Sequence, residues 1–194
     1  MSFTDSEIDR VLKAKVTLRD LLDNKARLFS EQYKSDVFDF LRLNCWLTGG
    51  AVASLLQGQH PKDFDFYVRN STSCSDAVLQ DLFIKEGAPY YDLVQTCNPS
   101  YMGMEQAGRV VTANAITLKA GIQIIRLANF ETSRKNFDFI HCMPYYDWDK
   151  LYISKQQLDS ILTKTLVPNP TSRQLTHHRL QKFKERGWKL NHTI

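Results

Sequence analysis

The stretch CWLTGGAVASLLQGQHPKDFDFYVRN, Cys45–Asn70, decides the fold that this chain is expected to adopt. It opens with a short apolar run, CWLT, which is typical of a buried strand. The pair Gly49-Gly50 follows, and AVASLLQ then continues with a helical pattern. After a loop, FDFYV has the aromatic and β-branched composition of a second strand. The residues therefore predict a strand–turn–helix unit with a second strand close behind it.

The glycine pair is a candidate anion site. Glycines permit unusual backbone angles and let a ligand approach the amides without a Cβ in the way. The free N–H groups and the dipole at a helix start favour an anion, typically a phosphate. Gly49, Gly50 and the next amide, that of Ala51, are therefore candidates for holding phosphate. The same pair is also compatible with simple turn chemistry.

The second feature of this stretch is a pair of aspartates. Strand alternation places Asp63 and Asp65 on one face and Phe64 and Phe66 on the other. Two carboxylates roughly 7 Å apart along a strand repel each other unless solvent or a cation separates them. Hard oxygen ligands of this kind suit Mg²⁺, which binds through one or two carboxylates plus substrate phosphates. The alternative is an exposed edge strand with two solvated aspartates.

Taken in this order, the glycine turn and the D-x-D strand resemble the signature of the DNA polymerase β-like nucleotidyltransferases. The closest branch contains the CCA-adding enzymes and bacterial poly(A) polymerases. The resemblance implies a Mg²⁺- or Mn²⁺-dependent enzyme that transfers a nucleoside monophosphate from an NTP, with ATP expected, to an acceptor hydroxyl. The acceptor would be RNA, such as a tRNA 3′ end, or a protein. Asp63 and Asp65 would be the catalytic metal ligands, and the glycine turn would hold the triphosphate.

Later segments extend this resemblance. The segments IQIIRL and KNFDFIHCMPYYD are similar to the branch's later strand and its R-R-D-F-T-x-N-A-M-A element, with Asp138 at the motif aspartate. The segment HHRLQKFKERGWKL is similar to its neck helix, with Arg179 and Lys182 at the two cationic positions. The resemblance therefore implies further nucleotide-binding residues: Arg126, Asp138, Arg179 and Lys182.

Three departures from the branch leave alternatives open. Ala53-Ser54 replace its usual Arg-Asp, Gln123 stands where a third acidic ligand is common, and the long RNA-binding helical body is missing. Two aspartates suffice, or Asp138 contributes, or the site is catalytically weakened. The rival hypotheses are therefore a nucleotide-binding or interaction module without catalysis, and a bacteriophage effector that modifies a host tRNA or protein.

The basic C-terminal stretch also has two interpretations. At helical spacing Arg179, Lys182 and Arg186 share one face. This face is either simply solvated, or it closes over a triphosphate or follows a nucleic-acid backbone.

Composition indicates an ordinary folded chain of 194 residues, with 43% hydrophobic residues, 24% charged residues and a net charge of +4. The expected fold is α+β, a mixed central sheet with N-terminal helices and a basic helical extension, divided as 1–44, 45–152 and 153–194. Helices are expected from a Thr4–Glu7 capping box and over about 26–43, and strands over RVVTANAITL and FDFIHCM.

Cysteine usage and the termini suggest a compartment. The four cysteines form no C-x-x-C pair and are expected to be reduced and mostly buried. No apolar run has membrane-spanning length, and MSFTDSEIDR lacks the form of a signal peptide. A cytoplasmic protein is expected, in the host cytoplasm if a phage encodes it. No residue pattern indicates the oligomeric state.

Overall fold

The computed structural model describes residues 2–33, 37–69, 110–111, 115–118, 121–125, 130–172 and 177–190. Arg126, which is predicted to bind nucleotide, lies outside the described residues.

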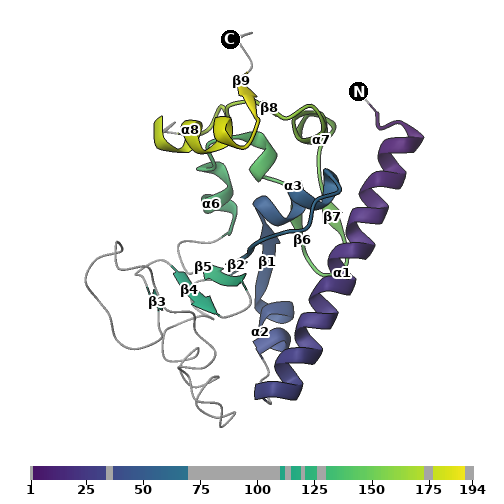
Figure 1. Ribbon diagram of the computed structural model, residues 1–194, viewed down its shortest axis with the longest axis vertical. Helices are drawn as coiled ribbons and strands as arrows, with labels where there is room; N and C mark the ends of the chain where they lie inside the picture. The colour runs from purple at the N-terminus through teal and green to yellow at the C-terminus, as the bar shows by residue number, and fades with distance from the viewer. Residues whose placement is uncertain are drawn as a thin grey trace.

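A mixed sheet forms the centre of the molecule (Figure 1). Among the described residues its strand order is β3-β4-β5-β2-β1-β6-β7. Only β2 and β5 pair in parallel there, and the other neighbours are antiparallel. The mixed α+β architecture expected from the sequence is thereby confirmed. The strands are β1 (Cys45–Thr48), β2 (Phe64–Val68), β3 (Val110–Val111), β4 (Ala115–Leu118), β5 (Ile122–Ile125), β6 (Tyr145–Tyr146) and β7 (Leu151–Tyr152).

Helices surround this sheet. Figure 1 shows α1 along one side of the molecule and α8 across the end where the C-terminus lies. A short parallel pair of strands, β8 and β9, accompanies α8. The elements are α1 (Asp5–Tyr33), α2 (Val37–Asn44), α3 (Gly50–Leu56), α6 (Phe130–Lys135), the 3₁₀ helix η3 (Ile140–Cys142), α7 (Lys155–Leu162), β8 (Thr165–Leu166), α8 (His177–Glu185) and β9 (Lys189–Leu190).

The start of α1 has the capping box that the sequence predicts. The Thr4 amide donates to Oε2 of Glu7 at 2.9 Å, and the Glu7 amide donates to Oγ1 of Thr4 at 3.4 Å. The other oxygen of Glu7 accepts from Nζ of Lys155 at 2.7 Å, and Lys155 also reaches Asp159 at 2.5 Å. The cap therefore also ties the first turn of α1 to α7.

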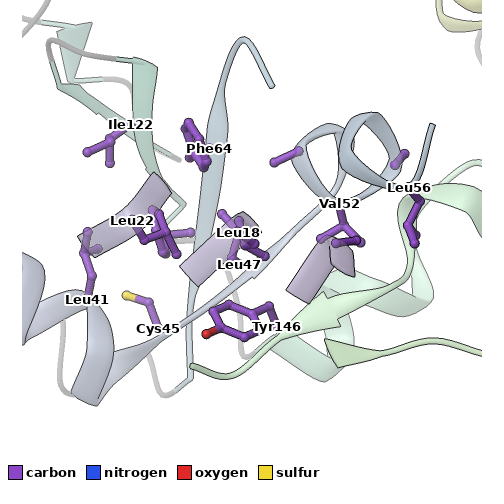
Figure 2. Packing of buried hydrophobic residues seen from close by; sticks show 14 of the residues in the cluster. Leu18, Leu22, Leu41, Cys45, Leu47, Val52, Leu56, Phe64, Ile122 and Tyr146 are labelled. Atoms are coloured by element: carbon purple, nitrogen blue, oxygen red, sulfur yellow. The ribbon is translucent and has the colours of Figure 1, made fainter. Parts of the chain in front are cut away.

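One face of the sheet packs against α1 to form the core (Figure 2). Alternation along β1 and β2 turns Leu47, Phe64 and Phe66 toward this face, and each of them is fully buried. Leu18 and Leu22 of α1 belong to the same cluster and are 0% exposed. These apolar side chains of β1 and β2 point into the core. The side chains of β2 that alternate with them therefore point to the opposite face of the sheet.

The predicted reduced state is confirmed for the two cysteines that the structure describes. Cys45 and Cys142 are buried and are not disulfide-bonded. Cys74 and Cys97 lie outside the described residues.

The helix expected over about 26–43 is wrong in its boundaries. α1 continues without a break through this region to Tyr33, and α2 begins only at Val37. Arg27 pairs with Glu31 four residues on, at 3.1 Å, and with Oδ1 of Asn24 at 3.0 Å. Such pairs on an exposed helical face support a helix where the apolar pattern fades.

Two expected strands are also corrected. RVVTANAITL is not one strand, because β3 and β4 pair antiparallel with each other, Val110 opposite Thr117. FDFIHCM contains the 3₁₀ helix η3 instead of a strand. The hydroxyl of Thr48 donates to the carbonyl of Cys142 at 3.0 Å, so this carbonyl bonds to a side chain of β1 outside any strand ladder.

No helix among the described residues is long and apolar enough to cross a membrane. The division into residues 1–44, 45–152 and 153–194 stays a prediction.

Candidate active site

The site is built on the face of the sheet opposite the core. Along β2, Phe64, Phe66 and Val68 are buried, whereas Asp65 and Tyr67 alternate onto the other face. In the sheet Asp65 lies between Thr48 of β1 and Gln123 of β5. Asp63 immediately precedes β2, so the strand alternation places the two predicted aspartates together as the sequence requires.

A cavity of about 410 Å³ opens over these aspartates. Of the eight predicted site residues that the structure describes, six line it: Gly49, Gly50, Asp63, Asp65, Arg179 and Lys182. Ala51 is buried in the core cluster and is not part of the cavity lining. Ala53 and Ser54, which stand where the related branch has Arg-Asp, line the cavity as well.

The glycine turn and the aspartate pair are in contact. Gly49 has φ 81° and ψ −142°, a conformation that is strained for any residue with a Cβ. A Cβ built there would lie 3.2 Å from Oδ2 of Asp65. Gly50, in contrast, has nothing within 4 Å of such an atom. Gly49 therefore has two reasons to be glycine, and the second is the carboxylate itself.

Gly121 is a structural requirement of the site that the sequence analysis missed. It has φ 72°, and a Cβ there would lie 2.7 Å from the carbonyl oxygen of Lys62. The start of β5 can therefore approach the backbone just before Asp63 only because position 121 has no side chain. Its place immediately before a strand pattern was the available signal, but its contact with Lys62 spans the chain and leaves no local trace.

The surroundings of Asp65 destabilise its negative charge. Burial, and to a lesser degree the nearby charge of Asp63, raise the pKa of Asp65 to about 6, while Lys182 and Arg179 act in the opposite direction. The cations of α8 therefore offset the charge of Asp65 only in part. A cation bound between the two aspartates would favour their ionised forms.

Cations from several elements line the same cavity. Arg179, Lys182 and Arg186 come from one face of the α8 segment, as the helical spacing predicts. Lys62 and Lys164 add to them from the loop before β2 and the turn after α7. Among the described residues, the lining thus holds five cationic side chains against two carboxylates, a balance that suits a polyanion.

Asp138 has a different position from the other predicted residues. It is 8% exposed, is not part of the cavity lining, and its Oδ2 forms an ion pair with Nε of Arg179. The Asn169 amide donates to the Asp138 carbonyl at 2.9 Å. Asp138 is therefore placed to orient Arg179, and its carboxylate is engaged away from Asp63 and Asp65.

An aromatic wall closes one end of the cavity. His141 is 2% exposed and stacks on Trp188 with ring centroids 4.0 Å apart, while Phe183 meets it edge-on at 4.7 Å. Burial, and to a lesser degree Arg179, lowers the pKa of His141 to about 3, so the ring is neutral near pH 7. Its Nε2 lies 3.3 Å from Sγ of Cys142, within hydrogen-bonding distance for a sulfur atom. The wall formed by His141, Phe183 and Trp188 was not predicted, because it joins η3 to α8.

The oxygen donors of the site fit a magnesium ion that is also coordinated by the substrate. Among the described residues no group of three or more His, Cys, Asp or Glu side chains could hold a metal. Asp63 and Asp65 form a pair, and Gln123 lies in register with Asp65 on the neighbouring strand. Mg²⁺ commonly binds through one or two carboxylates and completes its shell with water and substrate phosphates. The pair therefore fits a metal that arrives with a phosphorylated substrate.

A sequence model of the Gabija anti-defense 2 (Gad2) family matches residues 20–164. The chain belongs to the Gad2 family. The matched residues include the glycine turn, both aspartates and Asp138 of this Gad2-family chain, but they end before α8. No curated protein matches the chain.

Solved structures with a similar arrangement include CCA-adding enzymes. The Thermotoga maritima CCA-adding enzyme complexed with tRNA is 15% identical, covers 87% of this chain and 42% of its own, and has a TM-score of 0.47. A tRNA-processing enzyme with CTP is 16% identical, with 77% and 40% covered and a TM-score of 0.49. The chain spans less than half of the length of these two proteins.

Proposed function

We propose that this Gad2-family protein is a Mg²⁺-dependent nucleotidyltransferase. It would transfer a nucleoside monophosphate from an NTP, ATP first among them, to a hydroxyl group of an RNA or a protein. The observation that carries this proposal is the contact between the glycine turn and the aspartate pair, where a Cβ at Gly49 would lie 3.2 Å from Oδ2 of Asp65. A phosphate bound at the turn and a metal bound at the aspartates would then lie next to each other.

Each part of the cavity has a role in this proposal. Asp63 and Asp65 would hold the metal, and the amides of the glycine turn would bind the β- and γ-phosphates. When bound, a divalent cation supplies charge neutralisation for the triphosphate and activates the attacking hydroxyl. Arg179 and Lys182 would offset the remaining phosphate charge from the opposite wall. Asp138 would fix the orientation of Arg179 through their ion pair.

The proposed reaction needs no reactant other than the NTP and the acceptor hydroxyl. The acceptor oxygen forms a bond to the α-phosphorus as the bond to the leaving pyrophosphate breaks, and the acceptor proton goes to solvent. Positioning and electrostatic stabilisation would supply most of the rate enhancement. His141 is not needed as a base, because its ring is buried and its low pKa makes it a poor proton acceptor.

The family description supports a biological role. A member of a Gabija anti-defense family is expected to counteract the defence that the family name states. We propose that the transferred nucleotide modifies an RNA or a protein on which this defence depends, as a phage effector would.

The test is label transfer with two positions of label. The protein is incubated with ATP labelled at the α- or the γ-phosphate, Mg²⁺, and lysate from cells with or without the Gabija genes. The proposal predicts α-label in a macromolecule and no γ-label there. The label is lost with Asp63→Asn and Asp65→Asn but kept with the exposed control Asp149→Asn. Sensitivity of the product to ribonuclease or to protease identifies the acceptor class.

One observation favours a second candidate, a nucleotide-binding module without catalysis. Gln123 is in register with Asp65 on the adjacent strand and brings no negative charge to the third position of the site. In this case ATP binds with Mg²⁺, yet neither label reaches any macromolecule under any lysate condition. Gln123→Asp then provides a further comparison, since added transfer activity would show that only the third carboxylate was lacking.

A further inference from the structure

α1 carries an exposed apolar stripe that the core does not use. Ile8, Leu12 and Val16 are 44%, 54% and 47% exposed. They are four residues apart and therefore form one row on the helix surface. The buried side of the helix is elsewhere, at Leu18 and Leu22. Single exposed apolar residues are ordinary, but three in a row on one helix form a continuous patch.

Charged residues flank this stripe in an ordered way. At about 100° per residue, Asp5, Asp9, Lys15 and Arg19 fall on the same side of α1 as the stripe. The two acids lie toward the helix start and the two bases toward its middle. Within the described part of the chain, no ion pair engages Asp5, Asp9 or Lys15, and Arg19 reaches only its exposed neighbour Asp20 at 3.6 Å.

We propose that this face of α1, Asp5–Arg19, binds the same face of a second copy of the chain in antiparallel orientation. A two-fold axis at Leu12 places this residue opposite its own copy and Ile8 opposite Val16. The same register sets Asp5 opposite Arg19 at each end of the contact. Apolar residues thus meet apolar residues along the seam and an acid meets a base at both ends, whereas Asp9 and Lys15 lie on opposite flanks of the seam.

The charges select the antiparallel arrangement. A parallel pair in register would place Asp5 against its own copy, and would do the same with Arg19. Like charges in such positions repel, whereas the antiparallel pair turns these contacts into attractions. A two-fold pairing also uses the same patch on both copies and closes the assembly at two.

The proposed dimer leaves the candidate active site accessible. α1 packs on the face of β2 that carries Phe64 and Phe66, whereas the cavity lies over Asp65 on the other face. Figure 1 shows α1 along the side of the molecule, apart from α8 at its end. The inference therefore does not depend on the proposed function, and nucleotide transfer and dimerisation can fail independently.

The size of the patch predicts a weak, concentration-dependent dimer. Three apolar side chains per copy make a surface at the low end of specific protein interfaces. The dimer should therefore be seen as a monomer–dimer equilibrium in analytical ultracentrifugation over a hundredfold range of concentration. Adding salt should weaken it, because the flanking charges are exposed.

The test uses substitutions that separate this register from any other contact. Leu12→Glu should weaken the dimer at least tenfold, because it sets two like charges on the axis. Leu28→Glu is the matched control, since Leu28 is 48% exposed on the same helix but points away from the stripe. It should leave the equilibrium unchanged. Thermal melts of both variants check that the fold is kept.

A charge exchange tests the register directly. Asp5→Lys alone and Arg19→Asp alone should each weaken the dimer severalfold, and the double variant should restore it. The two residues are about 21 Å apart along one helix, so rescue requires the second copy. A monomer at every concentration overturns the proposal. A dimer that ignores Leu12→Glu, or a double variant no better than the singles, overturns it as well.

Discussion

The two faces of β2 have opposite requirements, although they alternate residue by residue along one strand. On the core face, Phe64 and Phe66 are buried under α1, and their value lies in packing. On the cavity face, Asp65 is held among charges, with a pKa that burial raises to about 6. The core face stabilises the protein, whereas the cavity face lowers the free energy of unfolding because it holds the partly buried charge of Asp65. Substitutions on the two faces should therefore change stability in opposite directions.

The largest effect is expected on the core face. Phe66 is 0% exposed and stacks on Trp148 with centroids 5.8 Å apart. Phe66→Ala should lower the free energy of unfolding by about 3–5 kcal/mol, because it removes a buried ring and leaves a cavity. Urea denaturation measures the change. A loss of unfolding free energy as small as that of an ordinary surface substitution would mean that the Phe66 ring contributes little to the stability of the core.

The glycine turn should divide into one sensitive and one tolerant position. Gly49→Ala should destabilise the protein by about 1–3 kcal/mol, because its backbone conformation is strained for any other residue. It should also weaken ATP binding, since the new Cβ presses on Asp65. Gly50→Ala is the matched control for stability, because no protein atom lies within 4 Å of its Cβ, and it should leave the free energy of unfolding nearly unchanged. Equal losses of stability at the two positions would contradict the geometry.

Titration of His141, which belongs to the aromatic wall, should lower the free energy of unfolding at acid pH. His141 has a folded-state pKa of about 3 against an ordinary value of 6.5, so the unfolded chain binds the proton first as pH falls. The stability that the neutral ring provides is complete above pH 6.5 and is lost progressively toward pH 3. Between pH 7 and pH 5 this loss should be about 2 kcal/mol.

His141→Phe keeps the ring without the titrating group. Its stability should fall less than that of the wild type over the same pH interval, as followed by urea titrations at each pH. Parallel curves for the two proteins would show that His141 does not titrate differently in the folded state.

The smallest effect has the opposite sign. In metal-free buffer at neutral pH, Asp65→Asn should stabilise the protein by about 1–2 kcal/mol, because it removes a buried charge that Asp63 opposes. Mg²⁺ should raise the melting temperature of the wild type and leave that of the variant unchanged. A variant less stable than the wild type without metal would break the comparison between the two faces.

The part of the site that sequence reasoning found is the part made of near neighbours. The strand–turn–helix unit and the D-x-D strand follow from residues within Cys45–Asn70, and the alternation of β2 then places the aspartates. The helical spacing of Arg179, Lys182 and Arg186 is local in the same way. All three line the cavity, as a shared face requires.

What sequence reasoning could not find depends on contacts between distant segments. Gly121 is required by the backbone of Lys62, and Asp138 faces Arg179 instead of the cavity. The segment around His141 has a strand-like composition. Its Cys142 carbonyl nevertheless accepts a hydrogen bond from the Thr48 hydroxyl, and the segment forms η3. The exposed pairs of Arg27 continue α1 where apolar periodicity alone predicted a break.

The central claim is that the glycine turn and the aspartate pair serve one metal-bound triphosphate. Isothermal titration with a non-hydrolysable ATP analogue, with Mg²⁺ and then with EDTA, tests it most directly. The account predicts binding that weakens at least about tenfold without metal and equally in Asp63→Asn and Asp65→Asn. Affinity that is the same with and without Mg²⁺, and unchanged in both variants, would contradict it.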